Sequence, residues 1–185
     1  WSSDVCSSDL VLDANGRAIA QSQGDALPKE NFADRTYFKV HQRASDDILY
    51  VSEPLQSRID QDWIIVVSRR IANADGSFGG VVAGSVSLAY FQALFMNLNA
   101  HKDDTFAILS SDGILISRHP FSLMDIGKRL GQTTLLRVIE NKQTAIFRAV
   151  SPIDSMERLY AAARVPNLPL IVTYAMPEKC IYTAW

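Results

Sequence analysis

The sequence predicts an α+β fold of two tandem domains, each built on a central antiparallel sheet with flanking helices. Two observations carry this prediction. A segment that reads strand, turn, strand occupies residues 11–20 and recurs at residues 108–117, with Asn15-Gly16 and Asp112-Gly113 at the two turns. After each copy, the apolar residues change from a strand period to a helical period and back again. With 185 residues, 48% of them hydrophobic, the chain is long enough for two small cores.

The first domain is expected to contain a hairpin, a helix, a second hairpin and a linking helix. The dipeptides Asn-Gly and Asp-Gly favour two-residue hairpin loops, because these residues adopt positive φ at low cost. Residues 31–43 carry aromatic side chains at helical spacing. Residues 63–71 and 78–88 form strands around Asp75-Gly76, and residues 88–98 carry the apolar stripe of an amphipathic helix.

The second domain repeats this order. After its hairpin come a loop over residues 118–131, a helix over residues 132–141 and three strands at residues 144–150, 158–165 and 170–176. The predicted boundaries are residues 11–98 for the first domain with its linking helix and residues 99–185 for the second. Residues 1–10 contain Ser-Ser-Asp twice and have no helix or strand period, so we interpret them as a non-native or disordered leader.

Composition excludes several classes of function. The net charge of −2 and the pI near 5.9 argue against nucleic-acid binding. Apolar runs are far shorter than the roughly 18 residues of a membrane span. The histidines stand singly, Cys6 and Cys180 lie at opposite ends, and hydrolase and nucleotide-binding motifs are missing. We therefore expect neither catalysis nor a metal or other cofactor in this chain.

Six segments resemble the double Cache sensors, which are PAS-like extracytoplasmic domains of bacterial diguanylate cyclases and histidine kinases. They are residues 12–17, 34–38, 67–71, 75–82, 90–91 and 151–154. The resemblance implies a periplasmic part of an inner-membrane protein, which acts as a homodimer. It also implies that a long N-terminal helix is missing here, so that apolar surface which the helix would cover is exposed.

The cluster Asp34-Arg35-Thr36-Tyr37-Phe38 is the leading candidate for ligand binding. A guanidinium fits a carboxylate through two hydrogen bonds, and aromatic rings supply apolar walls. In relatives that bind amino acids and dicarboxylates, this helix contacts the ligand carboxylate, which implies roles for Arg35, Tyr37 and Phe38. The alternative has Phe38 in the core and Arg35 paired with Asp34 or Asp46.

Three further residues complete the predicted site. By the resemblance, amino-acid sensors hold the ligand ammonium with an aspartate where this chain has Ser85. A neutral hydroxyl cannot balance a buried ammonium, which leaves small carboxylates or another polar metabolite as ligands. Strand alternation lets Ser68, on the neighbouring strand, face the same pocket, and Tyr50 is a further candidate for the lining.

The expected function is a small-ligand sensor module of a membrane receptor, most often a diguanylate cyclase in chains with these motifs. The alternatives are the sensor of a histidine kinase or chemoreceptor, and a ligand-independent module for structure and dimerisation. A haem sensor would have to use His41 as the axial ligand. The second domain is expected to act as a spacer and transducer.

Overall fold

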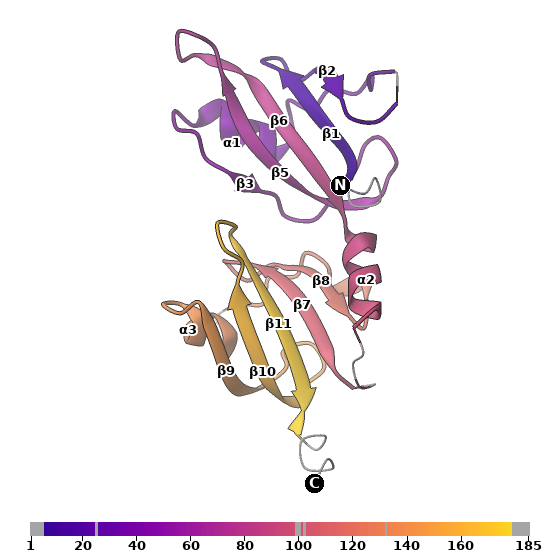
Figure 1. Cartoon of the computed structure of the whole chain (residues 1–185), viewed down its shortest axis with the longest axis vertical. Coiled ribbons are helices and arrows are strands. Elements are labelled where there is room, and N and C mark those ends of the chain that lie inside the picture. Colours follow the sequence, from indigo (N-terminus) through magenta and orange to yellow (C-terminus); the bar gives the residue numbers. More distant parts are fainter. Residues whose placement is uncertain (1–5, 25, 99–100, 102, 132, 179–185) are drawn as a thin grey trace. The chain divides into compact units, whose positions relative to one another are not determined.

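The computed structural model describes residues 6–24, 26–98, 101, 103–131 and 133–178. The chain divides into two compact units, residues 1–90 (unit 1) and residues 91–185 (unit 2), each with its own antiparallel sheet (Figure 1). None of the helices in the described ranges is long and apolar enough to cross a membrane.

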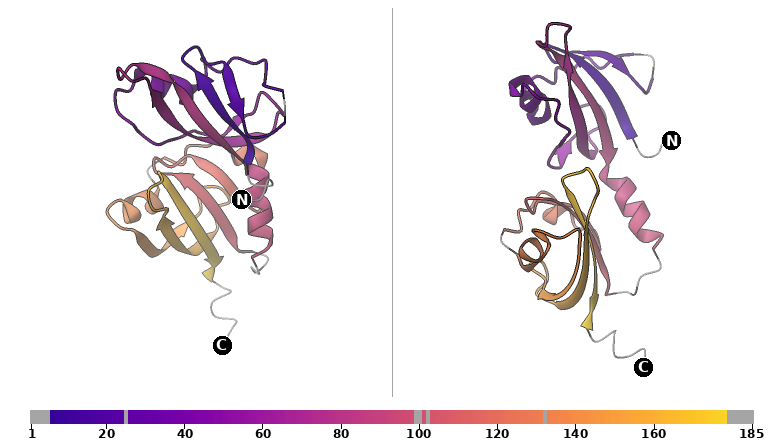
Figure 2. Two further views of the ribbon diagram at one scale, coloured as in Figure 1. Left: turned by 45° about the horizontal axis from the view of Figure 1, so that its top comes forward. Right: turned by 60° about the vertical axis from the view of Figure 1, so that its left-hand side comes forward.

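Unit 1 is built on a six-stranded sheet. Its strands run in the order β2-β1-β6-β5-β3, and β4 pairs with β5. Helix α1 packs against β5 and β6, on one face of the sheet (Figure 2). The elements are β1 (Cys6–Asp13), β2 (Ala18–Gln21), α1 (Thr36–Arg43), β3 (Tyr50–Val51), β4 (Leu55–Gln56), β5 (Trp63–Ala72) and β6 (Phe78–Ser87).

Unit 2 is built on a five-stranded sheet in the order β8-β7-β11-β10-β9. Helix α3 packs against β9 and β10. Helix α2 (Leu88–Met96) precedes the sheet, and the other elements are β7 (Thr105–Ser110), β8 (Leu115–His119), the short 3₁₀ helix η1 (Leu123–Asp125), α3 (Thr134–Ile139), β9 (Thr144–Val150), β10 (Glu157–Arg164) and β11 (Leu170–Pro177). In both units the first hairpin lies at one edge and the last strand lies at the centre, beside the first strand.

Both sheets and their antiparallel pairing are confirmed. Several boundaries differ from the sequence prediction, two of them in unit 1. The first helix begins at Thr36, because residues 31–35 form a lead-in that consists of a bridge to the first hairpin followed by a turn. Strand β1 begins at Cys6, inside the stretch interpreted as a leader, and its backbone pairs with β6.

The hairpin loops are longer by one residue than the Asn-Gly and Asp-Gly dipeptides predicted. In each loop three residues separate the closing pair, and the glycine is the third of them, at a φ of 77° for Gly16, 82° for Gly76 and 87° for Gly113. Only the glycine needs the left-handed region in this loop, which ends in a bulge. The preceding aspartates accept hydrogen bonds within the turns, as the Asp13 carboxylate does from the Asn15 and Arg17 N–H groups.

The core of each unit lies between the sheet and its helices. In unit 1 it contains Leu12, Phe38 and Val81, all fully buried. In unit 2 it contains Leu115, Ile139 and Ile171. Each unit therefore has a core of its own.

Candidate functional site

The lead-in to α1 is fixed to the first hairpin of unit 1. The Asn31 side chain donates to the Asn15 carbonyl at 2.8 Å, and the Phe32 N–H donates to the Gly16 carbonyl at 2.8 Å. A side chain at Gly16 would collide with the backbone of Ala33, so only glycine allows this close approach. This contact positions Arg35, which is the N-cap of α1.

A cavity lies between α1, the loop after β4 and the face of the sheet. About 30 Å³ of it is accessible to water, room for roughly two water molecules at about 15 Å³ each. Two arginines line it, Arg35 and Arg58, and none of the described lining residues is an acid. The polar lining residues are Arg35, Tyr37, Ser57, Arg58 and Ser85, and the others are Leu10, Phe32, Leu55, Ile59, Ile64, Val66 and Ala83.

Arg35 is only partly satisfied by the protein. One amino group of its guanidinium (Nη2) donates to the Gln56 carbonyl at 2.8 Å. Its Nε is buried and has no hydrogen-bond partner. An unpaired buried donor costs about 1–3 kcal/mol, and an acceptor in the cavity would remove that cost.

Arg58 is held beside the cavity by a two-point ion pair. Its guanidinium donates to both oxygens of Asp34, at 2.8 and 2.6 Å, and to the Asn31 carbonyl. The hydrogen bonds and the charge of Arg58 outweigh the desolvation of Asp34 and lower the pKa of that carboxyl. Burial raises the pKa of Tyr37 to about 12, so its hydroxyl stays protonated at neutral pH.

The structure brings three of the six predicted residues together. Arg35, Tyr37 and Ser85 line the cavity, although they come from α1 and from β6. Arg35 pairs with neither Asp34 nor Asp46, the partners that the alternative reading considered. The Asp34 carboxylate binds Arg58 instead.

The other three residues do not line this cavity, and two of them, Ser68 and Tyr50, contact His41. Phe38 is fully buried and meets the ring of Phe78 edge-on at 5.3 Å, as the alternative reading expected. Ser68 Oγ lies 2.9 Å from His41 Nε2, and the Tyr50 ring packs edge-on to His41 at 6.2 Å between centroids. His41 does not line the Arg35 cavity, and burial lowers its pKa.

Register explains why the two serines separate. Val66 pairs with Ser85, and Ser68 pairs with Ala83, so all four side chains lie on one face of β5 and β6. Ser68 therefore shares the sheet face of Ser85 but does not line the predicted pocket. Alternation could not show that Ser68 lies two residue pairs further along the strands, next to His41.

Sequence reasoning missed Arg58 and Ser57. They follow the two-residue strand β4 and carry no motif, and only the fold brings them to the N-terminus of α1. Within the described residues, no group of three or more histidine, cysteine, aspartate or glutamate side chains could hold a metal ion.

Comparison with known proteins identifies the family of this chain. The chain matches the family described as Cache domain over residues 4–185. Among solved structures, the extracellular domain of rpHK1S-Z16, a protein assigned as a histidine kinase, is 30% identical with a TM-score of 0.82, and the match covers 98% of this chain and 74% of that one. None of the curated proteins matches.

Two more distant structures share the fold. The periplasmic sensory domain of the Campylobacter jejuni chemoreceptor Tlp1 is 13% identical with a TM-score of 0.76, over 100% of this chain and 76% of that one. The ligand-binding domain of the Pseudomonas aeruginosa PAO1 amino acid chemoreceptor PctB, in complex with L-Arg, is 16% identical with a TM-score of 0.68, over 96% and 74%. The chain belongs to the Cache domain family, whose members of this type are extracytoplasmic ligand-sensing domains.

Proposed function

We propose that unit 1 senses a small carboxylate, which binds in the cavity beside Arg35. The observation that carries this proposal is the buried Arg35 Nε without a partner, next to an amino group that Gln56 already orients. A carboxylate oxygen would accept from this donor, and the Tyr37 and Ser85 hydroxyls would line the same space.

The charges of the lining favour an acid over an amino acid. Solved Cache-like structures have been determined with ligands that contain an amine, such as L-Arg and L-Gln on PctB, asparagine on Mlp24 and GABA on PctC. In this chain two arginines and no described acid line the cavity, and Ser85 stands where the resemblance puts an aspartate. An ammonium would find no counter-charge there.

Binding would have to shift the loop that carries Ser57 and Arg58. A water-accessible space of about 30 Å³ is too small for a carboxylate of several carbon atoms. The ligand would therefore bind a more open conformation better than the closed one, which is the requirement for a ligand-driven switch.

The whole receptor is inferred from the family. We infer that the chain is the periplasmic part of a dimeric, membrane-anchored protein with two PAS-like domains, and that α2 links the ligand-binding domain to the second. The 30% identical neighbour is assigned as a histidine kinase, which favours a kinase output over a diguanylate cyclase. A module for structure and dimerisation alone is the competing function.

A thermal-shift screen of organic acids, amino acids and amines tests the ligand class. Carboxylates should stabilise the protein, and Arg35→Ala should weaken their binding by roughly tenfold to a hundredfold, as expected for a charge-assisted hydrogen bond of about 1.5–3 kcal/mol. Arg43→Ala is the matched control, because Arg43 is an exposed arginine on the same helix. Equal shifts in both variants would rule out Arg35 as the anchor, and a screen without any stabilising acid would favour the structural module.

A further inference from the structure

Unit 2 contains a cavity more than twice as large as that of unit 1. About 70 Å³ is accessible to water, room for roughly five water molecules at about 15 Å³ each. It lies between the inner face of the sheet and α3. Most of its wall is apolar, with Leu109, Leu115, Leu135, Phe147 and Ile153 among the lining residues.

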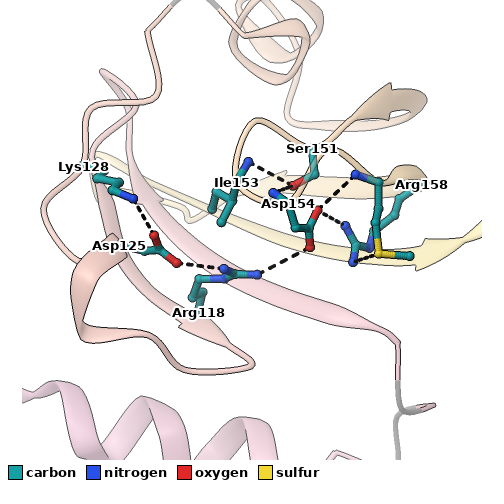
Figure 3. Close-up of polar contacts among 8 residues, drawn as sticks. Arg118, Asp125, Lys128, Ser151, Ile153, Asp154 and Arg158 are labelled. Carbon is teal, nitrogen blue, oxygen red and sulfur yellow. Dashed lines mark hydrogen bonds and ion pairs between the residues drawn. The ribbon is translucent and has the colours of Figure 1, made fainter.

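One side of this cavity is cationic. Arg118 lines it and donates through Nη1 to Asp125 at 2.9 Å, while its Nη2 lies 4.0 Å from Asp154, too far for a hydrogen bond (Figure 3). The Arg118 side chain is 11% exposed. One amino group of the guanidinium is therefore hydrogen-bonded to Asp125, and the other faces Asp154 as an ion pair without a hydrogen bond.

The carboxylates near Arg118 are already used by other cations. Asp125 accepts from Lys128 at 2.7 Å, and Asp154 accepts from Arg158 at 2.7 Å. The hydrogen bond from Lys128, followed by that from Arg118, lowers the pKa of Asp125 against its desolvation, so this carboxyl is charged at neutral pH. The cluster thus holds three cations and two carboxylates, and an anion would balance it.

Thr133 supplies a second donor without a partner. Thr133 occupies the N-cap of α3, where a threonine hydroxyl normally accepts from the helix backbone, but it makes no such bond. Its Oγ1 is buried, and the residue lines the cavity. A buried hydroxyl that serves neither the helix nor another side chain needs an external partner.

We propose that unit 2 is a second binding site, for a short-chain carboxylate with an apolar tail. The carboxylate would accept from Arg118 Nη2 and from the Thr133 hydroxyl, and the tail would lie against the leucines and Phe147. This site is independent of the Arg35 cavity and gives unit 2 a role in recognition beyond that of a spacer.

Methyl NMR with butyrate as the probe tests this proposal and separates the two sites. The Ile153 methyl groups line the unit 2 cavity and the Ile64 methyl groups line the unit 1 cavity, so each reports on one site. Butyrate should shift the Ile153 resonances saturably. A response confined to Ile64, or none at Ile153 up to about 20 mM butyrate, would overturn the unit 2 site, and the first result would still support unit 1.

Two substitutions identify the anchoring groups. Thr133→Val removes only the hydroxyl and should weaken butyrate binding about five- to tenfold, while Arg118→Lys should weaken it at least tenfold because the planar fork is lost. Thr144→Val is the control, because Thr144 is an exposed threonine of the same unit outside this cavity. Since Arg118 is in a buried ion pair, folding of Arg118→Lys is verified by circular dichroism. Whether or not Arg118→Lys folds, an unchanged butyrate affinity in Thr133→Val contradicts the proposal.

Discussion

At the residue scale, Asp154 links the stability of unit 2 to acid pH. Burial disfavours its charge, but hydrogen bonds from Arg158, Ser151 and the Met156 N–H, together with the charge of Arg158, lower its pKa to about 2. Because this folded-state pKa lies below the ordinary value of 3.8, the stabilisation is complete above about pH 4 and disappears as the pH falls towards 2.

We expect Asp154→Asn to destabilise unit 2 by about 1–2 kcal/mol at pH 7. The lowered pKa sets an upper limit of about 2 kcal/mol, which is reduced because the side chain is partly exposed. Urea unfolding at pH 7 and near pH 2.5 measures the effect, which should shrink at the lower pH. Glu157→Gln is the control on a neighbouring exposed carboxylate. A penalty of the same size at both pH values would show that ionisation of Asp154 is not its cause.

The candidate site could be predicted only in part at this scale. The resemblance selected Arg35, Tyr37 and Ser85, which line one cavity. Arg58 and Thr133 could not be found in this way, because their importance depends on long-range packing and on a missing cap bond. Arg118 is the first residue of the predicted loop over residues 118–131. In the structure it belongs to β8 and lines the cavity of unit 2.

At the element scale, the three hairpin loops share a conformation and differ in what surrounds the glycine. Gly16 and Gly76 have φ values of 77° and 82°. A Cβ at Gly76 would meet nothing within 4 Å, whereas a Cβ at Gly16 would overlap the backbone of Ala33. Substitutions at these two glycines therefore separate two free-energy costs: that of a left-handed backbone, and that of displacing the lead-in to α1.

We expect Gly76→Ala to cost about 1 kcal/mol, from the left-handed backbone alone. Gly16→Ala should cost at least about 2 kcal/mol more, because the lead-in to α1 must move away from the hairpin. The movement would displace Arg35, so carboxylate binding in unit 1 should weaken in Gly16→Ala and not in Gly76→Ala. Melting curves and the thermal-shift screen measure both effects, and equal behaviour of the two variants would refute the docking role.

The spacing of apolar residues and the turn residues were enough to predict which strands and helices form. The lengths of these elements also depend on tertiary packing, which the sequence pattern does not show. Strand β9 matches its predicted residues 144–150, because alternation and flanking turns define both ends. Helix α3 is shorter than the predicted residues 132–141, because Thr133 caps it in an extended conformation and residues 140–143 turn into β9. The hairpin loops contain three residues and not the predicted two, because a three-residue loop that ends in a bulge fits the twist of the strands.

At the scale of the whole molecule, the outer face of the unit 2 sheet is apolar, and only part of it is covered, by Phe95 of α2 stacked on Phe106. One cross-strand row runs through Phe106, Tyr174, Ala161 and Ile146, on β7, β11, β10 and β9. These residues line a shallow groove, and Ile146 is 75% exposed. A continuous apolar surface of this kind binds hydrophobic dyes and promotes association.

We expect Ile146→Thr to reduce binding of the dye ANS and to change the free energy of unfolding by less than about 0.5 kcal/mol, since little burial is lost. Met124→Thr is the matched control, because Met124 is 83% exposed and lies outside the groove. Dye fluorescence and melting temperature are the two measurements. If both variants lower ANS binding equally, single exposed side chains rather than the groove bind the dye.

The strand order common to both units has a consequence for how such a receptor can diversify. Each unit has its own sheet and core. Mutations that remodel one cavity are therefore expected to leave the fold of the other unit intact. One copy can retain its chemistry while the other explores a new one, as happens after a gene is duplicated. A single chain can in this way acquire a second specificity without passing through an inactive ancestor.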